Sequence, residues 1–165
     1  MKLDSMQDLM VMMLKDLHSA ENQLLGMLPN IIAATSSNEL RESLMQHTKE
    51  TEGQVQRLEQ ILTKLGEQAS GRYNKAADAL LTEAKELAQM KGEPDVIDAA
   101  LVAAQQKFEH NEIASYGTAV TFAKLLGDRQ AAELLAKTLD EEEKMDKHLS
   151  ELAMKKINPE AEASA

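Results

Sequence analysis

Apolar residues recur at steps of three and four along five stretches of the chain, which is the period of an amphipathic α-helix. The predicted helices cover about residues 5–34, 37–65, 76–91, 94–126 and 129–156. Polar segments separate them, and Gly66 and Gly127 stand where two of the helices should end. Pro29 lies inside the first stretch, but the apolar pattern resumes after it, so we expect a kink there and not an end. The pattern therefore predicts an all-α fold.

The third predicted helix is shorter than the other four. The segment between Gly71 and Gly92 has about 20 residues, which as a helix would span roughly 30 Å, the height of a bundle of the longer helices. Such a helix can act as a crossover, so that the next long helix starts at the same end as the second one. We therefore predict a four-helix bundle with one crossover helix. The alternative is a fifth helix packed on an ordinary bundle.

Charged residues interrupt the apolar stripes at one depth. When each pair of long helices is folded at its polar turn, Glu21 lies level with Glu50, and Glu112 lies level with Glu142. Each pair is about 22 Å from its turn, because a helix rises about 1.5 Å per residue. Four carboxylates in one buried layer would lose their hydration and repel one another. A pair of divalent cations removes both costs, so the pattern predicts a dinuclear metal site.

Further candidate ligands lie three or four residues from these acids on the same helix faces: His47, Glu109 and Asp146. The alternative for His47 is a hydrogen-bonded core residue. Tyr116 and Gln54 are candidates for supporting hydrogen bonds to the ligands, although Tyr116 could simply pack in the core. Other charged residues near the layer are expected to face solvent: Glu52, Arg57, Glu59, His110, His148 and most of the acidic run Asp140–Glu143.

Length and composition limit the remaining possibilities. The 165 residues suit one domain over residues 1–158, followed by a short disordered tail over 159–165. The chain has no cysteine, so any transition metal must be held by oxygen and imidazole ligands. A net charge of −10 disfavours nucleic acid and anionic lipid as partners. Charged residues interrupt the N-terminal apolar residues, and no apolar run could span a bilayer, so we expect a cytoplasmic protein.

The two halves of the sequence also match weakly at a shift of about 91 or 92 residues. The corresponding positions are Glu21 with Glu112, His18 with Glu109, Glu50 with Glu142, and Gln54 with Asp146. Identity between the halves is low, but acids recur at equivalent depths. Two related hairpins would build a site with approximate twofold symmetry, which suits two metal ions.

Several segments along the four long helices carry a resemblance to a known family: Ser19–Leu24, His47, Glu50–Thr51, Gln54–Glu59, Glu109–Thr118 and Thr138–Glu142. At these positions the chain resembles the bacterial YciE/YciF stress-protein family, within the ferritin-like superfamily, and the similarity extends over nearly its whole length. The resemblance implies a ferritin-like bundle, a homodimer, a dinuclear iron site and a role under stress.

The chain departs from the wider ferritin-like pattern in one respect. Diiron sites of that superfamily commonly place a histidine three residues after a glutamate on the second and fourth helices. Here Gly53 follows Glu50 at that distance, and Met145 follows Glu142. The site is therefore expected to be rich in carboxylate and poor in imidazole, which leaves the choice between iron, manganese and a mixed pair open.

Three functions are compatible with this site. The first is a diiron oxidoreductase with ferroxidase- or peroxidase-like activity, in which Fe(II) is oxidised by dioxygen or peroxide; manganese would instead indicate catalase-like chemistry. The expected roles are terminal ligation by Glu21 and Glu112, bridging by Glu50 and Glu142, and completion of the coordination by His47 with Asp146 or Glu109. The second is a dimeric stress protein that binds metal without turnover. The third is a purely structural bundle whose acids reach solvent.

Overall fold

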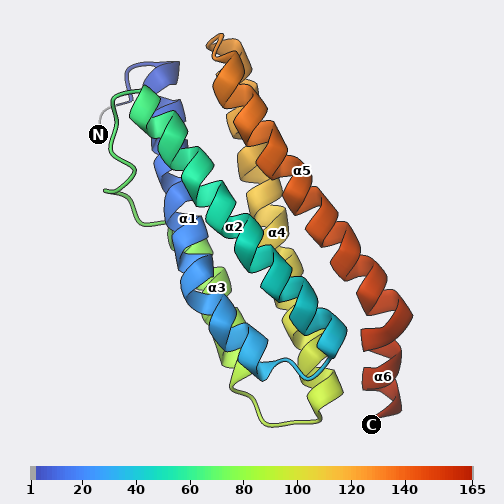
Figure 1. Cartoon of the computed structure of the whole chain (residues 1–165). Helices are drawn as coiled ribbons and strands as arrows, with labels where there is room; N and C mark the ends of the chain where they lie inside the picture. The colour runs from blue at the N-terminus through green and yellow to red at the C-terminus, as the bar shows by residue number, and fades with distance from the viewer. Residues whose placement is uncertain (1–2, 165) are drawn as a thin grey trace.

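The computed structural model describes residues 3–164, and this part of the chain is helical with no β-strand (Figure 1). Four long helices form the bundle: α1 (Met6–Ala34), α2 (Asn38–Lys64), α4 (Pro94–Leu125) and α5 (Arg129–Leu152). The shorter α3 (Lys75–Ala88) lies between α2 and α4 in the sequence. A π-helical turn, η1 (Ala153–Ile157), and a final short helix, α6 (Asn158–Ala163), follow α5. The predicted all-α fold is confirmed.

The direction of the helices confirms the predicted crossover. Helices α1 and α2 form one antiparallel hairpin, and α4 and α5 form the other (Figure 1). Helix α3 returns along the bundle, packed against α1 and α4, so that α2 and α4 run in the same direction (Figure 1). At 14 residues, α3 is shorter than the 20 residues expected. The non-helical segment over residues 67–74 covers the remaining distance.

Two of the long helices, α2 and α4, end just before a glycine, as the sequence predicted. Gly66 and Gly127 adopt φ angles of 76° and 74°, in the left-handed region that only glycine enters without strain. After Gly127, the Asp128 side chain accepts a 3.0 Å hydrogen bond from the Ala131 amide and so caps α5. Pro29 lies inside α1, which continues to Ala34 as expected. These ends fix the lengths of both hairpins.

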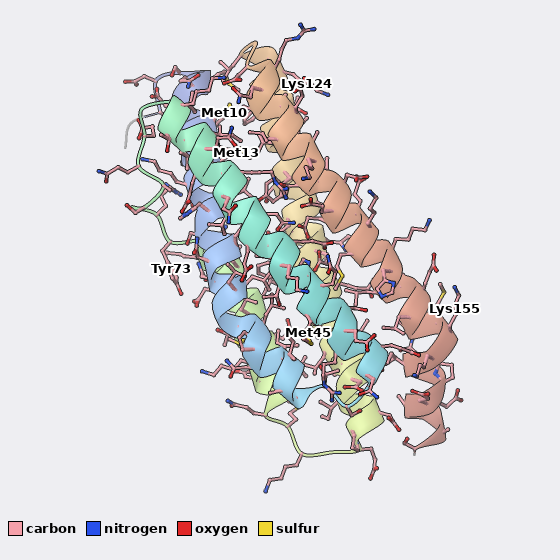
Figure 2. All side chains as sticks on the ribbon, in the orientation of Figure 1. Met10, Met13, Met45, Tyr73, Lys124 and Lys155 are labelled. Atoms are coloured by element: carbon pink, nitrogen blue, oxygen red, sulfur yellow. The ribbon has the colours of Figure 1, made fainter. Side chains whose placement is uncertain are left out.

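Two apolar clusters fill the bundle, one toward each end. The first includes Leu28 of α1, Leu44 of α2 and Phe108 of α4; the second includes Leu14 of α1 and Leu58 of α2. A layer of buried polar side chains separates the two clusters at mid-height: Glu21, His47, Thr51, Gln54, Glu109, Glu112, Thr138 and Glu142. Side chains such as Met45, Tyr73 and Lys124 project from the outer surface instead (Figure 2).

One buried acid outside this layer has a structural task. The Asp98 carboxylate of α4 accepts hydrogen bonds from the Ser36 amide at 2.9 Å, the Ser36 hydroxyl at 2.6 Å and the Ser37 amide at 2.7 Å. It therefore ties the turn between α1 and α2 to the start of α4. The apolar pattern gives no indication of this contact, because it joins residues about sixty positions apart.

The C-terminal segment differs from the predicted disordered tail. Residues 158–163 form α6, and the Ser164 hydroxyl donates a 2.7 Å hydrogen bond to Asp95 near the start of α4. Ala165 lies outside the described residues.

Between residues 3 and 164, no helix is both long and apolar enough to traverse a lipid bilayer.

Candidate metal centre

The four long helices bring five ionisable side chains together at mid-height. His47 of α2, Glu109 and Glu112 of α4 and Glu142 of α5 each offer one ligand atom, and these four atoms lie within 4.8 Å of one another. Glu21 of α1 is buried beside them, close enough for its charge to raise the pKa of Glu112. All five side chains are at most 1 % exposed. We call these five residues the carboxylate cluster.

Within residues 3–164, most polar atoms of the carboxylate cluster have no hydrogen-bond partner. Both oxygens of Glu112 and one oxygen each of Glu21, Glu109 and Glu142 are unpartnered, as are both ring nitrogens of His47. His47 Nε2 lies 3.3 Å from Glu109 Oε1, but the two atoms are not in hydrogen-bonding geometry. Because buried polar atoms in folded proteins are almost always partnered, this concentration indicates a site for a ligand that accepts electron pairs.

Three neighbouring side chains each hold one oxygen of a cluster carboxylate. Tyr116 Oη donates to Glu21 Oε1, and Gln54 Nε2 donates to Glu142 Oε1. Gln105 Nε2 donates to Glu109 Oε1 at 2.6 Å. In each carboxylate the other oxygen remains unpartnered. The donors therefore orient the acids without occupying all of their acceptor atoms.

The sequence predicted Tyr116 and Gln54 in this supporting role, and the structure places both beside the cluster. Sequence reasoning missed Gln105, which is also buried. A signal was present, because Gln105 precedes Glu109 by four residues and the two side chains therefore share a helix face.

Burial and mutual repulsion shift the pKa values of the cluster acids upward. Burial is the largest cause of the raised pKa of Glu21, Glu109 and Glu112. The second cause is a neighbouring charge: Glu142 acts on Glu21 and Glu109, and Glu21 acts on Glu112. The pKa of Glu142 is raised by burial as well. In the metal-free protein these carboxyls therefore retain protons that they would lose in water.

Burial lowers the pKa of His47 to about 4. The imidazole is therefore neutral near pH 7, with a nitrogen lone pair available. A neutral imidazole is the form that binds a metal ion.

The structure does not place Glu50 and Asp146, two predicted ligands, in the carboxylate cluster. Glu50 is half-buried at the seam between α2 and α5, where it accepts a 3.0 Å hydrogen bond from Gln46. A step of three residues rotates Glu50 about 60° away from His47, to the edge of the buried face of α2. Asp146 accepts a 3.0 Å hydrogen bond from Gln106.

Two other expectations concern residues just outside the cluster. His110 and His148 are exposed, as predicted. The prediction that Arg57 is solvated was wrong: its side chain is 13 % exposed, donates a 3.0 Å hydrogen bond to the Thr138 hydroxyl and pairs with Glu141. The same Glu141 carboxylate accepts a hydrogen bond from Gln54. Arg57 therefore supplies positive charge close to an acidic layer.

The carboxylate oxygens and the imidazole nitrogen of the cluster suit divalent cations that favour oxygen and nitrogen ligands. Two ligands on opposite sides of one ion lie about 4.2 Å apart when each bond is about 2.1 Å, close to the 4.8 Å limit within the four-residue group. The chain has no thiolate to offer, so ions such as Fe(II) and Mn(II) match better than soft ions do. Four ionised carboxylates would also balance the charge of two divalent cations.

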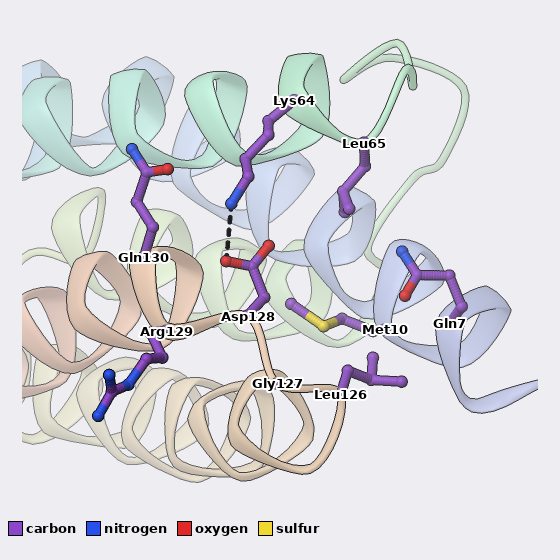
Figure 3. A pocket seen from close by; sticks show the side chains of 9 residues that line it. All are labelled: Gln7, Met10, Lys64, Leu65, Leu126, Gly127, Asp128, Arg129 and Gln130. Atoms are coloured by element: carbon purple, nitrogen blue, oxygen red, sulfur yellow. Dashed lines mark hydrogen bonds and ion pairs between the residues drawn. The ribbon is translucent and has the colours of Figure 1, made fainter.

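A surface pocket of about 470 Å³ lies elsewhere, at the end of the bundle where α4 turns into α5 (Figure 3). Met10 and Leu126 line it, and Lys64 pairs with Asp128 at 2.8 Å across it (Figure 3). Met10 is 11 residues before Glu21, about 16 Å along α1. This pocket therefore contributes no group to the carboxylate cluster.

A four-helix bundle with one crossover helix and a mid-height layer of carboxylates and histidine defines a ferritin-like protein. Comparison with known proteins gives the particular family. The chain belongs to the family described as a domain of unknown function, DUF892, whose model matches residues 5–162.

The chain is 40 % identical to Protein YciF of Escherichia coli (strain K12), over the whole length of both proteins. The crystal structure of that E. coli stress protein superposes with a TM-score of 0.90, covering 94 % of this chain and 99 % of the other. A protein named YcfI from Rhodopseudomonas palustris has a TM-score of 0.87 at 37 % identity, with coverage of 90 % and 95 %. A protein from Xanthomonas campestris shares the fold at 23 % identity, with a TM-score of 0.72 and coverage of 89 % of each chain.

Proposed function

We propose that the carboxylate cluster binds two iron ions and that the protein oxidises Fe(II) with dioxygen or peroxide as the oxidant. The proposal depends on one observation: all four long helices contribute buried carboxylate oxygens or imidazole nitrogens that have no hydrogen-bond partner among the described residues. Glu21, His47, Glu109, Glu112 and Glu142 would hold the ions. When bound, iron supplies one-electron redox chemistry towards the oxidant.

The chain itself supplies three things to this chemistry. Tyr116, Gln54 and Gln105 hold one oxygen of each of three acids, so the remaining oxygens are already positioned for binding. The apolar clusters above and below the layer exclude water and strengthen electrostatic interactions within it. The acids hold protons in the metal-free protein, so binding of each cation must release them.

The experiment measures bound metal and Fe(II) oxidation in the same sample, under dioxygen and under peroxide. We expect about two iron ions per chain and rapid, saturable oxidation. Glu142→Gln should abolish both, whereas Glu143→Gln and Glu52→Gln, which change exposed acids, should leave both unchanged. Equal behaviour of all three variants would contradict the site.

A second candidate is a metal-binding protein without turnover. The single imidazole of the cluster favours it, because ferritin-like diiron sites commonly use two and Gly53 and Met145 stand at the positions expected for them. Stoichiometric metal without oxidation would support this candidate. Bound manganese with disproportionation of peroxide would indicate the catalase-like alternative.

Two further parts of the proposal come from the relatives. The E. coli protein is named a stress protein, and we propose a related role here. We also propose the homodimer that the family resemblance implies. Sedimentation equilibrium at micromolar concentration tests the dimer directly, and a mass equal to that of one chain would contradict it.

A further inference from the structure

A groove of about 430 Å³ runs along the seam between α2 and α5, next to the carboxylate cluster. Ser43, Gln46 and Glu50 line it from α2, and Glu141, Lys144, Met145 and His148 line it from α5. Glu50 lies less than one helical turn from His47, and Glu141 directly precedes Glu142. The groove therefore reaches the surface at the depth of the cluster.

Glu50 links this groove to the cluster. It is half-buried, and Gln46 donates a 3.0 Å hydrogen bond to one of its oxygens. Its charge also acts on Lys144, but within residues 3–164 it forms no direct salt bridge. The pKa of Glu142 is raised by burial and also by the nearby charges of Glu141 and Glu50, so Glu50 acts across the seam on a cluster acid. Lys144, which lines the groove, pairs with Asp140, and Arg57 nearby pairs with Glu141.

The cluster needs such a route because its five side chains are closed to solvent. Each is at most 1 % exposed, and an apolar cluster covers the layer on both sides along the bundle axis. A hydrated divalent cation cannot cross those apolar layers without a large loss of hydration energy. The groove between α2 and α5 instead offers two carboxylates, Glu50 and Glu141, as ligands in place of water.

We propose that the groove between α2 and α5 is the route by which divalent cations reach the carboxylate cluster, and that Glu50 is their first ligand on it. This inference rests on the metal site proposed above. Glu50 binds the cation at the groove and passes it to the unpartnered oxygen of Glu142. Glu50 then returns to Gln46 and is not a ligand of the filled site.

This role has a kinetic signature that a ligand role lacks. A residue that acts only on the route stabilises the transition state for both uptake and release. Its removal slows association and dissociation by the same factor and leaves the dissociation constant unchanged. Loss of a true ligand weakens equilibrium binding instead.

Tyrosine fluorescence offers a direct reporter of the filled site. The chain has two tyrosines and no tryptophan. Tyr116 touches the cluster through Glu21, while Tyr73 is 59 % exposed and lies in the segment between α2 and α3 (Figure 2). In a Tyr73→Phe background, quenching by Co(II) therefore reports occupancy beside Tyr116 alone.

The test is stopped-flow mixing of the Tyr73→Phe protein with Co(II), together with an equilibrium titration. We expect Glu50→Gln to slow association at least tenfold while stoichiometry stays the same and the dissociation constant stays within threefold. Glu52→Gln, an exposed acid on the same helix, is the matched control and should keep the parental rate. Gln46→Phe, which adds bulk at the groove without removing charge, should also slow association.

The outcomes separate this proposal from the metal site on which it rests. An unchanged rate in Glu50→Gln overturns the route. Loss of a bound ion, or a tenfold weaker dissociation constant in Glu50→Gln, also overturns it, because Glu50 is then a ligand of the filled site. Failure of the parental protein to bind Co(II), or normal binding by Glu142→Gln, contradicts the metal site itself.

Discussion

At the scale of single residues, the acids of the carboxylate cluster lower the stability of the metal-free protein. Glu112 is an example: it is fully buried, and neither of its oxygens has a hydrogen-bond partner among the residues that the structure describes. Burial raises the pKa of Glu112, and the neighbouring charges of Glu21 and Glu142 raise it further. A residue in these surroundings destabilises the metal-free fold.

Glu112→Gln should therefore stabilise the metal-free protein and abolish tight metal binding. Glutamine has nearly the same shape but carries no charge, so its burial avoids the repulsion among the acids. At pH 8 we expect a gain of about 1–3 kcal/mol in the free energy of unfolding. Urea denaturation in the presence of a chelator measures this gain. Glu143→Gln, at an exposed position, is the control and should change stability by less than about 0.5 kcal/mol.

All five residues of the carboxylate cluster are among the ligand candidates that the sequence predicted, and there is a physical reason why the structure brings them together. Burial follows helix faces, and Glu21, Glu112 and Glu142 lie on the apolar stripes of their helices. Glu50 lies at the edge of its stripe, where a rotation of a few tens of degrees decides between cluster and groove. Periodicity does not resolve such a rotation, and only the packing of α2 against α5 determines it.

At the scale of helices, glycines with different backbone conformations should respond oppositely to substitution. Gly127 ends α4 with a φ of 74°, which an alanine adopts only with strain. Gly26 lies exposed inside α1, and an added Cβ there would meet no atom within 4 Å. We expect Gly127→Ala to destabilise the protein by about 1 kcal/mol and Gly26→Ala to stabilise it by about 0.5–1 kcal/mol. Thermal denaturation of both variants checks the signs, and a shift in the same direction for both would contradict this account.

The turn between α1 and α2 depends on Asp98 of α4. Asp98→Ala would leave the Ser36 and Ser37 amides without their acceptor. We expect a loss of about 2–4 kcal/mol in the free energy of unfolding, since each amide loses a charged acceptor. Asp140→Ala is the control, because Asp140 is exposed and only pairs with Lys144 on its own helix. Equal midpoints in urea for both variants would show that the turn does not need Asp98.

The type and order of the long helices were predictable from the sequence, whereas the start of α3 and the presence of α6 were not. The apolar stripes and the glycines that follow two of the helices predicted the bounds of the four bundle helices to within a few residues. Helix α3 is shorter than expected because residues 67–74, which precede it, are not helical. Helix α6 was missed because its order depends on packing against α4, which a short polar segment does not reveal.

At the scale of the whole molecule, the cluster links stability to pH and to metal. In the metal-free protein Glu21, Glu109 and Glu112 have raised pKa values, chiefly through burial. The folded state therefore binds more protons than the unfolded state once the pH exceeds the ordinary value of a glutamate. His47 acts in the opposite sense, because burial lowers its pKa to about 4. Its effect is confined to pH values below about 6.5, where the unfolded histidine becomes protonated.

Above pH 6.5, then, the carboxyls are the main cause, and the metal-free protein should lose stability as the pH rises. A cation that replaces these protons reverses the dependence, because its binding strengthens as the carboxyls ionise. At a concentration 100-fold above its dissociation constant, each ion should add about 2.7 kcal/mol. Urea midpoints at pH 6.5, 7.5 and 8.5, with chelator and with Mn(II), measure both effects. The slope with chelator should be smaller in Glu112→Gln, and a metal-free midpoint that rises over this range would show that the buried acids do not hold protons.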